Sequence, residues 1–219
     1  KARVAFLEGC AEPVLQPNIQ QAATRLFARM GIEVVPAPGQ GCCGALVHHL
    51  GKEASSLAFA RANVDAWSRV IDDGGLDAIV VTASGCGTSL KDYGFLLRNE
   101  PAYAARAAKV SALARDVSEV LAAHGLPAVT NPSGLVVAYH AACSLQHGQA
   151  VREAPRRLLT QAGFELRDIA ESHLCCGSAG VYDILQSEIA GQLRERKQAA
   201  LAAVAPQVVA TGNIGCLTQ

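Results

Sequence analysis

The chain has 219 residues, of which half are hydrophobic and 17% are charged, and its formal net charge is zero. This composition excludes an extended disordered chain, and the charge balance gives no support for nucleic-acid binding, which usually needs a basic surface. No apolar run approaches the roughly 18 residues that a membrane span requires.

The first half of the chain alternates short apolar runs with longer segments of helical periodicity. Short runs rich in β-branched residues are typical of buried strands. Gly31 is expected to end the first helix, because glycine readily adopts the left-handed conformation found at helix ends. The predicted strands are 2–7, 32–35 and 77–81, and the predicted helices are 19–30, 52–72 and 103–123.

The second half repeats this order after a turn-rich segment, 124–134, which is expected to be the hinge between two units, 1–130 and 131–219. Pro155 is expected to delay the start of the first regular helix of this half, because proline is tolerated only in the first turn. The predicted strands are 135–139, 164–166 and 207–210, and the predicted helices are 151–162 and 183–204.

The alternation of strands and helices predicts the α/β fold class, with two pseudo-equivalent Rossmann-like units that each contain a parallel sheet. In such sheets ligands bind beyond the carboxyl ends of the strands. The cysteines are expected on loops that leave those ends. Each unit would then gather four thiols at one rim of its sheet.

The cysteines themselves repeat between the two halves. In both halves, 31 residues separate the first cysteine from an adjacent pair that glycine follows, and a closing cysteine comes 42 or 39 residues later. Scattered core cysteines would not share this spacing, which is typical of an internal repeat. The candidate metal- and cofactor-binding residues are Cys10, Cys42, Cys43, Cys86, Cys143, Cys175, Cys176 and Cys216.

Three kinds of thiol site are compared. Adjacent cysteines place their Cα atoms about 3.8 Å apart, below the usual disulfide range of about 4.4–6.8 Å. Structural zinc usually takes ligands from two short pairs such as C-x2-C, which neither half contains. An iron–sulfur cluster is larger, so that neighbouring thiolates can bind different irons. The spacing favours a cluster, with zinc and disulfides as alternatives.

Glycines and histidines surround the cysteines. The glycines are expected either to let backbone N–H groups approach sulfur or to serve ordinary turns. His140 and His147 bracket Cys143, and any one histidine could replace a missing ligand or donate to a sulfur, although such residues are more often polar loop or cap groups. Trp67 is expected in the core.

The tandem C-x31-C-C-G arrangement, each copy followed by a later cysteine, resembles the CCG cysteine-rich domain family. That family includes the B subunit of heterodisulfide reductase and the iron–sulfur subunits of glycolate, lactate and anaerobic glycerol-3-phosphate oxidising complexes. Segments 84–94 and 211–219 look most like the C-terminal region of the glycolate oxidase iron–sulfur subunit. Members of that type also carry C-x2-C-x2-C-x3-C-P runs, which are absent here. Since the chain starts at Lys1 without Met, a fragment of a longer subunit is expected.

The sequence departs from the fuller family motif, which ends in C-x2-C and supplies five cysteines to a noncubane [4Fe-4S] cluster in heterodisulfide reductase. Ala83 and Asn213 stand where the first cysteine of that pair would be. Neither side chain is a good ligand for a thiolate-rich iron centre. The resemblance therefore implies four thiolates per unit and a conventional [4Fe-4S] cluster, one or two per chain, which aerobic samples can lose.

By resemblance, a flavin-containing oxidase subunit removes two electrons from a 2-hydroxy acid such as glycolate. This chain would pass them singly towards quinone or another acceptor, as an electron-transfer subunit of an oxidoreductase with no catalytic residue of its own. The implied location is cytoplasmic, or peripheral to the inner face of the membrane. The alternatives are thiol/disulfide catalysis of the heterodisulfide reductase kind, and a zinc-binding or metal-free docking scaffold.

Overall fold

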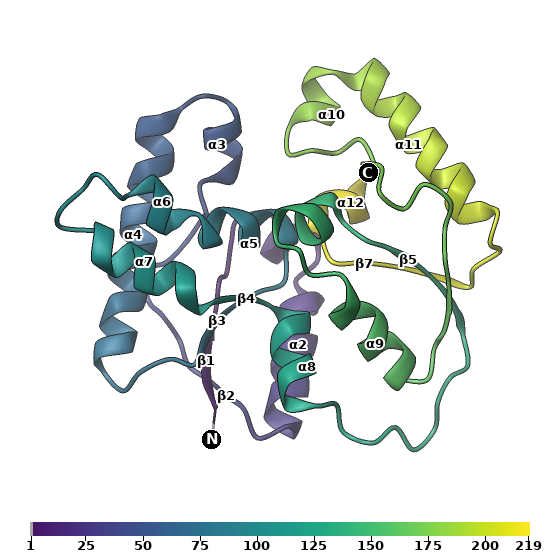
Figure 1. The fold of residues 1–219 in the computed structure, drawn as a ribbon, viewed down its shortest axis with the longest axis horizontal. Helices are drawn as coiled ribbons and strands as arrows, with labels where there is room; N and C mark the ends of the chain where they lie inside the picture. The colour runs from purple at the N-terminus through teal and green to yellow at the C-terminus, as the bar shows by residue number, and fades with distance from the viewer. Residues whose placement is uncertain (1) are drawn as a thin grey trace. The chain divides into compact units, whose positions relative to one another are not determined.

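A computed structural model of the chain describes residues 2–219 (Figure 1). They form two compact units, of which the first ends at Val120 and the second begins at Leu121. Each unit contains one sheet, and every strand pair in both sheets is parallel. The predicted α/β fold with two Rossmann-like units is confirmed.

The first sheet has the order β2-β1-β3-β4. Its two central strands are β1 (Arg3–Phe6) and β3 (Ala78–Val81), and Val4 pairs with Ala78. Both strands are apolar runs, and β3 is buried along its whole length because helices cover it on each side. The outer strands are β2 (Glu33–Val34) and β4 (Ala114–Asp116).

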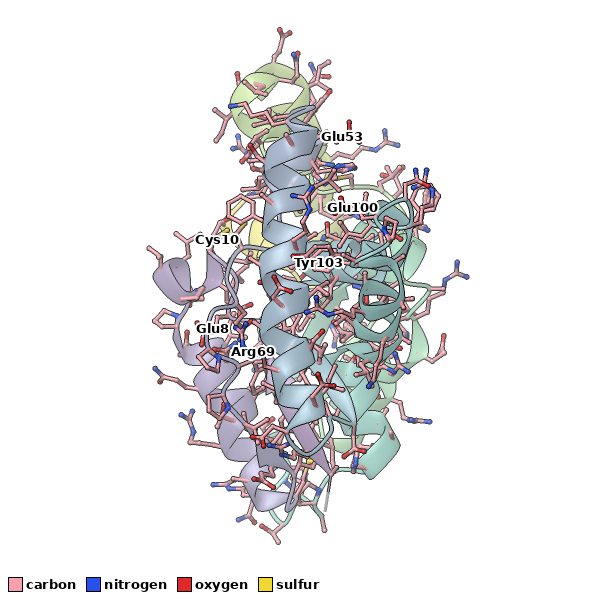
Figure 2. The ribbon with its side chains drawn as sticks, turned by 90° about the vertical axis from the view of Figure 1, so that its left-hand side faces the viewer. Glu8, Cys10, Glu53, Arg69, Glu100 and Tyr103 are labelled. Atoms are coloured by element: carbon pink, nitrogen blue, oxygen red, sulfur yellow. The ribbon has the colours of Figure 1, made fainter. Side chains whose placement is uncertain are left out.

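Eight helices are assigned from Glu12 to His124. They are α1 (Glu12–Leu15), α2 (Asn18–Arg29), α3 (Ala45–His49), α4 (Glu53–Asp72), α5 (Ser84–Lys91), α6 (Tyr93–Leu96), α7 (Ala104–Leu113) and α8 (Val117–His124). In Figure 2, α4 is seen from outside with Glu53 at one end and with Glu100 and Tyr103 beside it. Arg61 of α4 pairs with Glu100, and Tyr103 donates a hydrogen bond to Asp65. Trp67 is fully buried, as predicted.

The single helix predicted over 103–123 is wrong, because β4 interrupts it and adds a fourth strand to the sheet. Asp116 ends β4 and caps the next helix: its Oδ1 accepts a hydrogen bond from the Ser118 N–H at 2.9 Å. In return, the Glu119 carboxylate accepts one from the Asp116 N–H at 2.8 Å. This reciprocal capping box starts α8 at Val117 and competes with a continuous helix.

The second sheet has the order β6-β5-β7, with β5 (Val136–His140) at its centre between β6 (Glu165–Arg167) and β7 (Val208–Thr211). Its helices are a π-helical turn (Ser144–Gly148), α9 (Glu153–Gln161), α10 (Tyr182–Leu185), α11 (Ser187–Ala202) and α12 (Ile214–Thr218). Pro155 lies in the first turn of α9, where its missing N–H costs no hydrogen bond. The helix predicted over 183–204 is divided at Gln186 into α10 and α11.

Within residues 2–219, no helix combines the length and the apolar character needed to cross a membrane.

Candidate metal centres

The cysteines follow the carboxyl ends of the strands in both units. Cys10 comes after β1 and Cys143 after β5, and each adjacent pair comes after the neighbouring outer strand. The closing cysteines differ from the prediction of a loop. Cys86 and Cys216 are each the third residue of a short helix, α5 or α12, that directly follows a strand.

The first four thiols form a continuous row. The Sγ atoms of Cys42 and Cys10 are 3.5 Å apart, Cys42 contacts Cys43, and Cys43 contacts Cys86. The Gly44 N–H donates to the Cys42 Sγ at 3.4 Å, so a backbone donor reaches sulfur, which is the first of the two roles considered for these glycines. Gly44 has a φ of +82°, a left-handed conformation that glycine adopts without strain. We refer to Cys10, Cys42, Cys43 and Cys86 as the first quartet.

Burial and mutual contact favour the protonated form of Cys10, Cys42 and Cys43. Burial raises the pKa of Cys10, and contact with the Cys43 thiol, together with burial, raises that of Cys42. For Cys43, the contact with Cys42 favours the thiolate. The contact with Cys86 and burial outweigh it and raise the pKa of Cys43 to about 12. A metal that binds these sulfurs must displace protons, so binding and proton release are coupled.

Asn63 and Tyr93 fix the loop that carries the adjacent pair, and the sequence analysis did not single out Asn63. Asn63 is fully buried on α4, where its Oδ1 accepts from the Gly41 N–H at 2.8 Å and its Nδ2 donates to the Cys42 carbonyl at 2.9 Å. The Tyr93 hydroxyl donates to the Cys43 carbonyl at 2.8 Å and accepts from Asn63. The signal available in the sequence was a polar residue, Asn63, among the apolar residues on the buried face of α4.

The second quartet, Cys143, Cys175, Cys176 and Cys216, has the same order of contacts. Cys143 contacts Cys175, Cys175 contacts Cys176, and Cys176 contacts Cys216. The Gly177 N–H donates to the Cys175 Sγ at 3.3 Å, which matches Gly44 in the first unit. The sequence repeat is therefore also a repeat of sulfur geometry.

Donors and acceptors alternate along the second quartet. Contact with Cys175 raises the pKa of both Cys143 and Cys176. Contact with Cys143 lowers the pKa of Cys175, and contact with Cys176 lowers that of Cys216 to about 5. These contacts favour the thiol form of Cys143 and Cys176 and the thiolate form of Cys175 and Cys216.

His140 lies beside this quartet, whereas His147, the other histidine near Cys143, is exposed. His140 ends β5 and is only 3% exposed. One of its ring nitrogens and the sulfurs of Cys176 and Cys216 all lie within 4.8 Å of one another. In the described part of the chain, this is the only group of three or more His, Cys, Asp or Glu side chains that meets this distance criterion.

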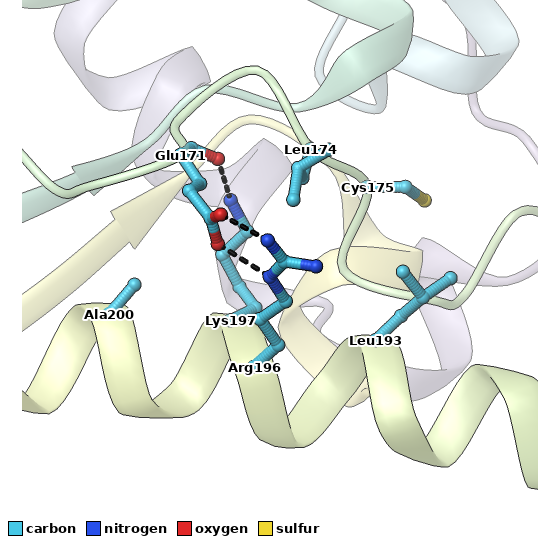
Figure 3. A pocket seen from close by; sticks show the side chains of 7 residues that line it. All are labelled: Glu171, Leu174, Cys175, Leu193, Arg196, Lys197 and Ala200. Carbon is cyan, nitrogen blue, oxygen red and sulfur yellow. Dashed lines mark hydrogen bonds and ion pairs between the residues drawn. The ribbon is translucent and has the colours of Figure 1, made fainter.

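Two basic residues of α11 hold the segment that leads to Cys175 (Figure 3). The Lys197 Nζ donates to the Glu171 carbonyl at 2.8 Å, and Arg196 forms an ion pair with the Glu171 carboxylate. Burial lowers the pKa of Lys197. The Cys175 sulfur points away from this ion pair in Figure 3. These residues anchor the loop and leave the sulfur free for the quartet.

Fold and sites together define a class: a duplicated α/β protein in which each parallel sheet presents one row of four thiols. The cysteine-rich domain family named CCG matches residues 4–91 and 137–219, so the chain belongs to that family and the resemblance seen in the sequence is confirmed.

Several curated proteins are similar over the whole chain. The glycolate oxidase iron–sulfur subunit of Escherichia coli is 44% identical, and the match covers 100% of this chain and 53% of that subunit. The probable glycolate oxidase iron–sulfur subunit of Bacillus subtilis is 33% identical, with 100% and 49% covered. Lactate utilization protein A of Bacillus licheniformis is 28% identical, with 98% and 89% covered. The chain thus spans about half the length of the two glycolate oxidase subunits.

Among solved structures, a hypothetical protein from Helicobacter pylori is similar with a TM-score of 0.67 at 11% identity. The match covers 98% of this chain and 42% of that one. At this identity the similarity supports the fold alone.

Proposed function

We propose that this chain is the electron-transfer region of the iron–sulfur subunit of a glycolate oxidase-like complex, and that its two quartets hold one or two [4Fe-4S] clusters. The observation that carries the proposal is the repeated row of four sulfurs at the carboxyl ends of both sheets. The similarity to glycolate oxidase iron–sulfur subunits supports the type of complex.

The spacing of the sulfurs supports a cluster over a disulfide or a single zinc ion. Cys10 and Cys42 have their Sγ atoms 3.5 Å apart, well beyond the bond length of about 2.05 Å. Zinc–sulfur bonds of about 2.3 Å bring four thiolates within about 4 Å of one another. In the described first unit, no three thiols lie within 4.8 Å of one another. A row of sulfurs fits a body with several irons better than it fits one ion.

The surrounding residues would act on a bound cluster in two ways. The Gly44 and Gly177 N–H groups donate to cysteine sulfur, and such bonds raise the potential of an iron–sulfur centre. Asn63 and Tyr93 hold the backbone of Cys42 and Cys43, so that little rearrangement is needed on binding. A cluster held here would accept and release single electrons. Four thiolates per unit leave no fifth cysteine for disulfide cleavage.

The partners are proposed on the same basis. A flavin-containing subunit would supply electrons taken from a 2-hydroxy acid, and quinone or another acceptor would receive them. The proposed location is cytoplasmic, or on the inner face of the membrane as part of the complex.

The test is anaerobic reconstitution of the full chain with iron and sulfide, followed by iron analysis and electron paramagnetic resonance. The Cys43→Ser and Cys176→Ser variants should each lose about four irons, one cluster, if both quartets bind. The double variant should bind none. As a control, Lys109→Cys adds an exposed thiol on α7 and should leave the iron content unchanged. A colourless wild-type chain that binds only zinc would refute the proposal.

A further inference from the structure

His140 is a buried polar side chain that faces cysteine sulfur. Neither ring nitrogen has a nitrogen or oxygen partner in the described structure, although the residue is only 3% exposed, and its interaction with the Cys216 sulfur helps to lower the pKa of that thiol. Nearly all buried polar groups in proteins have a partner or a ligand. The imidazole is therefore placed for something other than a nitrogen or oxygen atom of the protein.

The side chains around His140 indicate what kind of ligand the imidazole would bind. His140, Cys176 and Cys216 line a cavity of about 220 Å³, and their ligand atoms lie within 4.8 Å of one another. Thr211, the partner of His140 in the sheet register, also lines this cavity, and its buried Oγ1 has no hydrogen bond. Two thiols, an imidazole and a hydroxyl thus converge on one space.

The first unit has no equivalent. Leu7 occupies the position three residues before Cys10 that His140 occupies before Cys143, and it is buried in the apolar core. The repeat therefore conserves the four sulfurs but differs at this position. The fold does not need an imidazole at this position, since the first unit has leucine at the equivalent position.

We propose that His140 is a ligand of the metal centre in the second unit, where its imidazole nitrogen binds iron beside the sulfurs of Cys176 and Cys216. The inference rests on the proposed function, in which the second quartet holds iron. Imidazole is a good ligand for iron, and Asn213, at the position of the missing fifth cysteine, donates its amide towards the Cys216 sulfur at 3.7 Å instead. The second centre then has mixed nitrogen and sulfur ligands, and the first has sulfur alone.

This difference has a functional consequence. In the second unit the imidazole adds a neutral ligand to the four thiolates. The two centres therefore differ in ligand number and type, and we expect them to differ in reduction potential.

The test uses the full chain reconstituted anaerobically with iron and sulfide, grown once with ¹⁴N-histidine and once with ¹⁵N-histidine. Pulsed electron paramagnetic resonance should show a strongly coupled histidine nitrogen that changes with the isotope. His140→Gln, which can donate a hydrogen bond but binds iron poorly, should lose this coupling, and the potential of one centre should shift. His140→Cys should restore a stable centre without the nitrogen coupling.

His147→Gln is the matched control, because His147 is exposed and its ring lies 3.2 Å from the His173 carbonyl. It should retain the coupling. A wild-type chain that takes up iron and sulfide but shows no histidine coupling, or only the weak coupling of a hydrogen bond, overturns the role of His140 and leaves the proposed function intact. A wild-type chain that takes up no iron overturns both.

Discussion

Asn63 joins three parts of the first site through one amide: the Gly41 N–H, the Cys42 carbonyl and the Tyr93 hydroxyl. Replacement by leucine leaves two part-buried backbone groups of the cysteine loop, the Gly41 N–H and the Cys42 carbonyl, without this partner. We expect Asn63→Leu to lower the free energy of unfolding by about 2–4 kcal/mol and to weaken iron uptake by the first quartet. Urea unfolding and iron analysis measure the two effects.

The control for this change is Asn99→Leu, which makes the same replacement at an exposed position of the same unit. It should shift the urea midpoint little. Equal effects of the two variants would show that the loop does not depend on Asn63.

The glycines that follow the cysteine pairs allow a graded test. A Cβ at Gly177 would lie 2.5 Å from the Ala190 carbonyl oxygen of α11, whereas one at Gly44 would lie 3.2 Å from the Ser56 carbonyl oxygen. Both glycines have positive φ, so alanine costs about 1–2 kcal/mol at either position before any overlap. We therefore expect Gly177→Ala to destabilise the chain more than Gly44→Ala.

Gly31→Ala provides the reference value, because Gly31 has a φ of +72° and open space at its Cβ position. It should be the mildest of the three when thermal or urea unfolding is measured. A Gly177→Ala variant as stable as Gly31→Ala would contradict the close approach of α11.

For single residues, the sequence indicated which cysteines gather in each unit and that Trp67 lies in the core, because spacing and apolar periodicity can be read along the chain. It did not distinguish His140 from His147. Both bracket Cys143, but only the end of β5 turns its side chain towards the sulfurs, and this depends on strand geometry. Asn63 and Lys197 were missed for a similar reason, since their partners are more than 20 residues away in the chain.

Among the elements, β4 shows most clearly where sequence reasoning was insufficient. Alanine-rich segments favour helix on both sides of it, and only the Asp116-Val117-Ser118-Glu119 capping box indicates a new helix start. The three-residue strand gains its stability from pairing with β3, a tertiary contact. The other strands were placed within one or two residues because their apolar runs are distinct.

Asp116 also gives the first unit a pH dependence. Burial raises the pKa of this carboxyl, although hydrogen bonds from Ser118 oppose the shift. A raised folded-state pKa means that the stability contributed by Asp116 is fully present below its unfolded pKa, about 3.9, and is lost as the pH rises through the folded value. We expect Asp116→Asn, which keeps the capping oxygen, to remove this loss.

Urea unfolding of the wild type and of Asp116→Asn over this pH range measures the effect. The stability of the variant relative to the wild type should increase as the pH rises. Asp73→Asn, at an exposed carboxyl at the end of α4, is the control. Parallel pH profiles for the wild type and Asp116→Asn would contradict a buried, titrating cap.

On the scale of the whole molecule, the two sheets differ in how well the strands that precede their closing cysteines are protected. β3 is buried throughout and is paired on both sides, whereas β7 is at the edge of its three-stranded sheet with Val208 and Val209 40% and 45% exposed. Amide hydrogen exchange of the full chain, read by mass spectrometry, should be slower in β3 than in β7. Equal exchange rates in β3 and β7 would indicate that both sheets unfold in one cooperative step.

The duplication was predictable as a whole because sequence spacing, apolar runs and cysteine positions repeat together. The added strand and the single imidazole were not, since each belongs to one unit only.

The short distance between Cys10 and Cys42 has a practical consequence. Cys10 is exposed, and its Sγ lies 3.5 Å from that of Cys42, so an approach of about 1.5 Å would form a disulfide. In air, an unloaded chain should lose two protons and two electrons from this pair to oxygen. Thiol alkylation and mass spectrometry should then find the pair blocked, and reloading of the first quartet with iron should fail until a reductant such as dithiothreitol is added.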